Sequence, residues 1–406
     1  MWRAMDADRA VIDKLDRSPA THRRGMAVDV RLVTAAEFLC DTGLHAALSE
    51  IAKNPAEPNA FSEYWYLAAA ADKLRPGDDL RFAIVSDAEI IGLFPMQHMP
   101  AYARLPIAHL QNWLNPNAFL GAPLIRRGHE EAFWSKLLTF LDGHDGGANF
   151  LHLRAMAGDG PVMAALHRIC ATQKRQIAQV HNETRALLEH GLAPDAYLEQ
   201  AVRAKKRKEL RRQHKRLAEL GTLNCERGFG AQGLDGWIDE FLALERRGWK
   251  GANGSALDCA DKTRAMFRAA LHGAHRAGRL DLLALRLDGR AIAMLVNFLC
   301  LPGAFAFKTA FDEDYSRFSP GVLLQIENLE LLNHAGLAWC DSCAAQDHPM
   351  IDSIWTGRRA IGRYSVAIGG PLRRAAFAAM IGAEKAKARI RQIVGSSNRI
   401  GSGLKQ

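Results

Sequence analysis

Polar side chains of several chemical types are concentrated between residues 341 and 355. The segment contains one histidine, His348, and an imidazole with a pKa of about 6.5 suits a general base near neutral pH. Groups that could orient this ring or donate a proton are Asp341, Asp347, Asp352, Tyr315 and Tyr364. A lone histidine in a protein is also often a hydrogen-bonding residue of the scaffold, so the segment predicts either acid–base chemistry or a structural histidine.

A turn of small residues, Ser319-Pro320-Gly321, precedes a predicted helix. Apolar residues at positions 323, 326, 329 and 332 give this helix one face for a sheet. The first N–H groups of a helix have no partners within it and can bind a phosphate, and glycine lets the phosphate approach closely. The alternative is an ordinary helix start with proline in its first turn.

Lys308 and the pair Cys340 and Cys343 could each be structural or belong to a site. Lys308 alternates with Phe305, Phe307 and Phe311 in an apolar strand, so it faces either solvent or an anionic group in a site. Cys340 and Cys343 lack the second pair that a zinc site needs, which favours core or site-lining thiols. Seven scattered cysteines indicate a reducing compartment.

The elements that position these residues occur twice along the chain. Around residues 80–96 and 280–296, two apolar runs flank a short polar turn, and Asp288-Gly289 is a strong hairpin signal. Each hairpin is preceded by helices and followed by a strand, a loop, a helix and another strand. The order repeats after about two hundred residues, so two related α/β units are expected, joined by a basic helical connection around residues 190–220.

Composition and charge exclude several classes of protein. The 406 residues are 48% hydrophobic and 24% charged, which excludes a disordered, a collagenous and a polytopic membrane protein. Residues 201–220 and 371–406 each carry a charge of +7, which leaves the rest of the chain at −5. Both segments are predicted to be helices that either lie on an anionic membrane or face solvent. Binding of nucleic acid is less favoured, because the basic residues are not interleaved with aromatic residues that could stack on bases.

Four segments, taken in order, carry a resemblance to a known family. They are the basic run 203–221, the stretch 241–251, the hairpin 283–296 and the turn region 315–324. Together they resemble CelD/BcsL-type acetyltransferases of the GNAT superfamily, whose tandem build is shared with FemAB-type peptidyltransferases. The resemblance covers the chain beyond about residue 30 and is densest in the second half.

This resemblance implies a fold and a division of the chain. The expected fold is α/β (α+β), with two tandem GNAT-like domains, each a mixed and mostly antiparallel sheet flanked by helices. The expected parts are a mobile N-terminal tail (1–26), an N-terminal domain (27–188), a C-terminal domain (189–370) and a basic amphipathic tail (371–406). The first domain is expected to shape the acceptor pocket, and Arg126 and Arg127 there either meet an anion or form a solvated turn.

The resemblance also implies an enzyme that transfers an acyl group from acyl-CoA, as co-substrate and without a metal, to an amine. Main-chain donors of strand 304–311 could polarise the thioester carbonyl. The expected catalytic residues are His348, Asp341 and Tyr315; the expected cofactor-binding residues are Ser319, Gly321, Val322, Leu323 and Arg317; the expected substrate-binding residues are Lys308, Trp355 and Trp249.

Three hypotheses about function remain open at this point. The favoured one is an N-acyltransferase acting on an amino sugar of an envelope polysaccharide or on a lipid or sphingoid amine. The second is a FemAB-like transferase that uses aminoacyl-tRNA, and the third is a non-catalytic scaffold in envelope polysaccharide or lipid assembly. A cytoplasmic location is expected, with contact to the inner face of the membrane through the basic helices.

Overall fold

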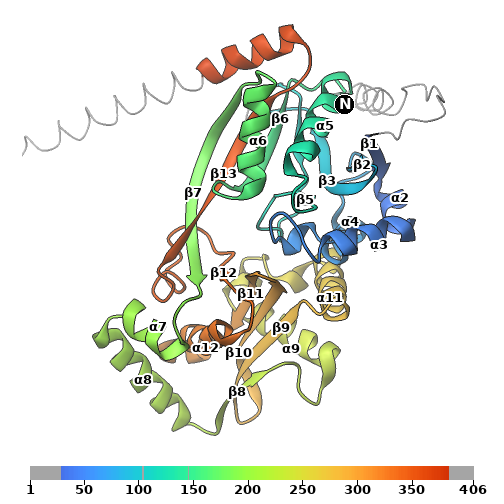
Figure 1. Cartoon of the computed structure of the whole chain (residues 1–406). Helices are drawn as coiled ribbons and strands as arrows, with labels where there is room; N and C mark the ends of the chain where they lie inside the picture. The colour runs from blue at the N-terminus through green and yellow to red at the C-terminus, as the bar shows by residue number, and fades with distance from the viewer. Residues whose placement is uncertain (1–28, 103–104, 145, 384–406) are drawn as a thin grey trace, which may run out of the picture.

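The chain folds into two successive runs of strands and helices that share one sheet (Figure 1). The computed structural model describes residues 29–102, 105–144 and 146–383. The first run contains β1 (Val30–Thr34), α2 (Ala35–Cys40), α3 (Thr42–Ile51), η1 (Ala60–Ser62), α4 (Tyr64–Leu74), β2 (Arg81–Asp87), β3 (Glu89–Met99), β4 (His109–Asn112), β5 (Leu124–Ile125), α5 (Glu130–Gly143), β6 (Phe150–Ala157), α6 (Pro161–Thr172) and β7 (Ile177–Glu189).

The second run begins with the basic connection and repeats the order of the first. It contains α7 (Pro194–Ala201), α8 (Ala204–Ala218), β8 (Leu223–Arg227), α9 (Gly233–Arg247), α10 (Trp249–Ala252), η2 (Leu257–Cys259), α11 (Asp261–Arg276), β9 (Leu280–Leu287), β10 (Arg290–Cys300), β11 (Gly303–Phe311), η3 (Glu313–Phe318), α12 (Pro320–Glu327), η4 (Asn328–Asn333), β12 (Trp339–Asp341) and β13 (Gly357–Ala367). The predicted repeat of hairpin, strand, loop, helix and strand is therefore confirmed.

The order of strands in the sheet shows how the two runs are joined. It is β1-β2-β3-β4-β6-β13-β7-β12-β11-β10-β9-β8, with β5 paired to β3 beside this path. Each run contributes one parallel pair, β4 with β6 and β11 with β12, and the other pairs are antiparallel. The last strand of each run pairs with the penultimate strand of the other, because β13 pairs with β6 and β7 pairs with β12. The predicted fold class, two units of mixed and mostly antiparallel sheet flanked by helices, is confirmed.

The hairpins form where the turn residues predicted them. Asp288 and Gly289 both have positive φ, 48° and 82°, as the turn between β9 and β10 requires. Strands β7 and β13 were not predicted, although they form the centre of the sheet. Because this centre crosses the expected division at residues 188–189, that division stays a prediction.

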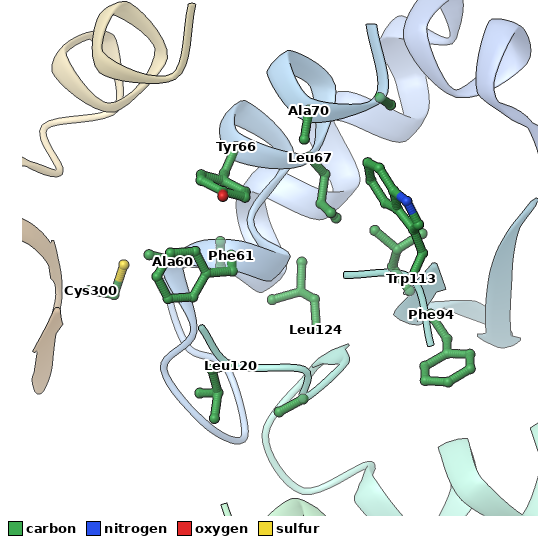
Figure 2. Packing of buried hydrophobic residues seen from close by; sticks show 14 of the residues in the cluster. Ala60, Phe61, Tyr66, Leu67, Ala70, Phe94, Trp113, Leu120, Leu124 and Cys300 are labelled. Atoms are coloured by element: carbon green, nitrogen blue, oxygen red, sulfur yellow. The ribbon is translucent and has the colours of Figure 1, made fainter. Parts of the chain in front are cut away.

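Aromatic side chains of the first run pack directly on strands of the second. Phe61 lies 5.4 Å from Phe305 between ring centroids, and Trp65 lies 4.9 Å from Phe298. Figure 2 shows Ala60 and Phe61 on the side of the cluster that faces Cys300 of β10. Burial of these rings gives the two runs a common hydrophobic core.

A buried network of charges crosses the centre of the sheet. The carboxylate of Asp341, which is fully buried, pairs with Arg185 of β7 at 2.6 Å and with Arg359 of β13 at 3.0 Å. Arg359 also pairs with Glu57 at 3.0 Å and stacks over the ring of Trp339. Burial raises the pKa of Glu57 to about 7, against the opposing effect of Arg359. The network therefore ties both exchanged strands to β12.

The basic segments are helical where the structure describes them. Helix α8 buries Leu210 and Leu217 and exposes most of its lysine and arginine side chains. Residues 371–383 also form a helix, whose Phe377 and Ile381 pack against Phe150 in a small cluster on the sheet. The expected N-terminal tail (1–26) and residues 384–406 of the expected C-terminal tail lie outside the described residues, so their predicted mobility and membrane contact stay predictions.

We expect Asp341→Asn to destabilise the fold by about 3–5 kcal/mol, because it leaves two buried guanidinium groups without a full counter-charge. The measurement is the free energy of unfolding from urea titration. Asp352→Asn is the matched control, because Asp352 is half-buried and lies 3.6 Å from the exposed Arg358, so its loss should cost less than about 1 kcal/mol. Equal losses in the two variants would contradict a special role for the network.

Candidate active site

Two parallel strands of the second run separate and open a cavity. The pairing of β11 with β12 covers only Gly303–Phe305 with Trp339–Asp341. Beyond it, β11 residues 306–309 and the segment after β12, residues 342–345, line opposite sides of a cavity of about 700 Å³. We call this the active-site cavity. A bulge at Phe307, which has no partner residue on β10, bends β11 beside it.

The predicted small-residue turn forms one end of this cavity. Ser319 adopts a left-handed conformation with φ of 54° between η3 and α12, and Pro320 occupies the first turn of the helix. Ser319, Gly321 and Val322 line the cavity. A Cβ on Gly321 would lie 2.9 Å from the sulfur of Met350, so a side chain there would intrude. The N–H of Gly321 has no hydrogen-bond acceptor among the described residues, which leaves it free for an anionic ligand.

Lys308 projects from β11 into the same cavity. Its Nζ lies 5.3 Å from the ring centroid of Phe119 and forms no ion pair in the described part of the chain. Burial, and next the positive charge of Lys250, lower the pKa of Lys308 to about 8. Lys250 itself is held by Glu245 at 2.8 Å and by the carbonyl of Thr309. The structure thus places Lys308 in the site, and a substantial fraction of its amine is neutral near pH 8.

His348 also lines the cavity, on the segment between β12 and β13. Its Nδ1 is buried and has no hydrogen-bond partner in the described ranges. Pro349 and Met350, which follow it, line the cavity near the Gly321 turn. A ring nitrogen without a partner is available to a ligand, so the predicted catalytic role of His348 stays a prediction.

Asp341 has a different environment from the one expected of a catalytic carboxylate. It does not line the cavity, and its oxygens are occupied by Arg185 and Arg359. These charges and the N–H of Cys343 hold the pKa of Asp341 below its usual range in spite of burial. Its visible effect on the site is to fix the backbone of Cys343, which lines the cavity wall.

The structure does not bring all predicted site residues to the cavity. Trp249 lines it, with half of its surface exposed. Arg317 is exposed and stacks on Phe318, while Leu323 and Trp355 are buried in the core and Tyr315 packs against that core. In the turn before α5, Arg126 pairs with Glu89 at 3.6 Å, and Arg127 donates a hydrogen bond to Asn54 at 2.8 Å. Trp355 and Asp341 are near His348 in sequence, but both side chains are fully buried and neither lines the cavity.

Sequence reasoning missed Phe119, Lys250 and Gln325, which line the cavity. Phe119 comes from the loop after β4, and no pattern in the sequence connects it to a site in the second run. Gln325 lies one helical turn beyond Gly321, and that spacing could have indicated it.

Among the residues described, no group of three or more His, Cys, Asp or Glu side chains is arranged to hold a metal ion. In the same part of the chain, no helix combines the length and apolarity needed to cross a membrane.

Substitution Lys308→Met should raise the free energy of unfolding by about 1–3 kcal/mol at pH 7, because burial of the ammonium opposes folding. The folded pKa of Lys308 lies below its unfolded value, so the penalty is complete below about pH 8 and fades as pH rises toward about 10.5. Urea unfolding at pH 7 and pH 10 measures both effects. Lys215→Met, an exposed lysine of α8, is the control and should change little at either pH. A pH-independent effect of Lys308→Met would contradict the shifted pKa.

Comparisons with known proteins agree with this geometry. No curated protein matches the sequence. Residues 204–348 match the family model described as an acetyltransferase (GNAT) domain. The crystal structure of FemX is similar with a TM-score of 0.53 and 11% identity over 82% of this chain and 98% of that one. A tandem GNAT protein from the clavulanic acid biosynthesis pathway gives a TM-score of 0.41 and 15% identity over 84% and 99% of the two chains. Residues 204–348 are therefore similar to a GNAT acetyltransferase domain, and the chain shares its fold with FemX.

Proposed function

We propose that the protein is an N-acyltransferase that moves an acyl group from acyl-CoA to an amine. The observation that carries this proposal is the active-site cavity itself. It opens where β11 and β12 separate, ends at the Ser319–Gly321 turn, and is lined mostly by residues that the GNAT domain model matches. A cavity that joins an anion-binding helix start to an apolar channel suits a ligand with phosphates at one end and an acyl chain at the other.

The residues present fit acyl-CoA as a co-substrate. The turn offers the N–H of Gly321, beside which the side chains of Met350 and Phe311 lie, and α12 has no acidic residue in its first turn. Phe307, Phe311, Val322 and Ile351 give the cavity apolar walls. When bound there, acyl-CoA would supply an acyl group activated as a thioester.

Lys308 is the residue we assign to proton transfer. Acyl transfer to an amine forms a C–N bond and breaks the C–S bond of the thioester, and the attacking nitrogen must lose a proton. A neutral Lys308 Nζ can accept that proton, and its pKa of about 8 suits this exchange near neutral pH. The leaving thiolate takes up a proton, so the numbers of protons balance over the turnover. His348, predicted as the base from the sequence, is the second candidate for this role.

Binding of acyl-CoA is expected to raise the midpoint of thermal unfolding, because a ligand that binds only the folded state stabilises it. Gly321→Trp should abolish this shift, since the side chain would fill the end of the cavity. Gly143→Trp is the matched control, because a Cβ at Gly143 meets no atom within 4 Å. Wild-type protein that shows no shift with acyl-CoAs of any chain length would refute the proposal.

The pH dependence of acyl transfer tests the assignment of Lys308. The value of kcat/KM should rise with pH and level off above about pH 8, because the neutral amine is the active form. Lys308→Met should lower kcat by about 10²- to 10⁴-fold with little change in the KM for acyl-CoA. His348→Gln is the comparison. A larger loss in His348→Gln, with the pH profile of Lys308→Met unchanged, would give the role to His348 instead.

The finer identity of the enzyme is part of the proposal. The resemblance to CelD/BcsL-type acetyltransferases supports an amine acceptor on an envelope polysaccharide or a lipid. The exposed basic face of α8 supports one alternative, a transferase that takes its group from aminoacyl-tRNA. Salt-sensitive binding of tRNA without any effect of acyl-CoA would favour that alternative. Absence of both effects would leave a non-catalytic scaffold.

A further inference from the structure

A second cavity, of about 590 Å³, lies next to the active-site cavity. It is lined by the loop that follows β4, including Asn115 and Phe119, and by Arg154 and Ala155 of β6. Strands β4 and β6 are the parallel pair of the first run, so this cavity occupies the place that the active-site cavity has in the second run. We call it the first-run cavity. The two cavities share Phe119 and residues 343–345 as a common wall.

Three arginine side chains line the first-run cavity, and two of them, Arg154 and Arg363, have no acidic partner among the described residues. Arg154 lies on β6 and Arg363 on β13, at a bulge where Gly362 pairs with Met156 and Tyr364 pairs with Leu153. The buried side chain of Asn112 forms two hydrogen bonds with the backbone of Arg154. Its Oδ1 accepts from the N–H of Arg154 at 2.8 Å, and its Nδ2 donates to the carbonyl of Arg154 at 2.9 Å. Bulges redirect side chains and are common next to binding sites. The position of Arg154 is thus fixed by the scaffold.

Neither arginine has an acidic partner among the described residues. Glu183, which also lines the cavity, is engaged with His181 at 3.3 Å, and Asp341 is engaged with Arg185 and Arg359. Burial, and then the charge of Arg363, lower the pKa of Arg154. Arg154 is partly buried and Arg363 is exposed to solvent, and an anion that bound both guanidinium groups would offset the repulsion between them.

We propose that the first-run cavity binds the amine acceptor and selects an acceptor that carries a phosphate or carboxylate group. The anionic group would lie between Arg154 and Arg363, and guanidinium groups bind both kinds of anion through two parallel hydrogen bonds. This inference rests on the proposed function, because it names the acceptor for the same reaction. It adds a binding site and a substrate class that the active-site cavity alone does not define.

The shared wall explains how such an acceptor reaches the thioester. Phe119 lines both cavities, and Lys308 Nζ lies 5.3 Å from its ring centroid. An acceptor anchored by its anion at the arginines can therefore extend its amine past Phe119 and Cys343 toward Lys308. Positioning of the amine by a remote anionic group is the kind of contact that raises kcat/KM without taking part in the chemistry.

The first experiment measures anion binding without any acyl-CoA. Inorganic phosphate is titrated against the full chain carrying Gly321→Trp, which blocks the anion site proposed at the start of α12. The unfolding midpoint is followed for this chain and, in the same background, for Arg154→Gln, Arg363→Gln and the double variant. Loss of one charged hydrogen-bond partner should weaken phosphate binding by about tenfold or more, and the double variant should show no shift. Arg358→Gln is the matched control, because Arg358 is an exposed arginine of β13 that does not line the cavity. A phosphate shift that survives in the double variant would overturn the proposal.

The second experiment measures acceptor choice with matched amines. Glucosamine 6-phosphate is compared with glucosamine, and lysine with cadaverine, by following release of free CoA thiol from acetyl-CoA and from a long-chain acyl-CoA. In at least one pair, the anionic amine should be preferred by about tenfold or more in kcat/KM, and the pair that shows the preference identifies phosphate or carboxylate as the anion. Both arginine variants should lose this preference through a higher acceptor KM, with the KM for acyl-CoA unchanged. Transfer with equal efficiency to both members of both pairs would overturn the proposal.

These measurements separate this inference from the proposed function. If acyl-CoA gives no thermal shift and no thiol is released with any amine, the proposed function fails, whereas the phosphate titration still reports on the arginines. If acyl-CoA binds and is turned over but phosphate binding does not depend on Arg154 and Arg363, the acceptor site alone is refuted.

Discussion

The charge on Asp341 is the constraint on which the centre of this fold depends. A carboxylate without solvent contact is tolerated only when opposite charges and hydrogen bonds compensate for its lost hydration. Here Arg185 and Arg359 supply that compensation from the two exchanged strands, and the N–H of Cys343 supplies a hydrogen bond from the next segment. The carboxylate oxygens of Asp341 on β12 therefore form ion pairs with both β7 and β13. They also fix the backbone of Cys343, which lies in the wall between the two cavities. The continuity of the sheet across the two runs and the shape of the cavity wall therefore both depend on this pairing.

The exchange of last strands makes the two runs interdependent. Strand β13 can complete the first run only after the second run has been made, and β7 completes the second run. Glu57 of the first run extends the charge network to Arg359, and its pKa of about 7 means that the folded state takes up a proton there near neutral pH. Together with the shared aromatic core around Phe61 and Phe305, this argues that neither run is stable alone.

The sequence predicted the elements with strong local signals and missed those defined by distant partners. The Asp288-Gly289 turn and the flanking apolar runs specify their hairpin locally, and the Ser319–Gly321 turn marks a helix start in the same way. Strands β7 and β13 carry buried charges such as Arg185 and Arg359 where central strands usually carry apolar residues. These charges can be buried because their partner, Asp341, lies on β12. The sequence around β7 or β13 alone does not reveal that partner. For the same reason Phe119 could not be predicted, and Trp355, expected to bind substrate, lies buried away from the cavity.

The two cavities lie at corresponding places in the two runs but differ in the charges that surround them. Each lies where a parallel pair of strands separates, but the helices that follow β4 and β11 begin differently. Helix α5 has Glu130 and Glu131 in its first turn, and these charges offset the positive potential of its N-terminus. Helix α12 begins at Pro320 and has no acidic residue in its first turn, so its N-terminus can attract an anion. In the first run, positive charge is supplied instead by Arg154 and Arg363, on the strands themselves. Under the proposed function, acyl-CoA would bind in the opening of the second run and the acceptor in the opening of the first, with Phe119 and Cys343 between them.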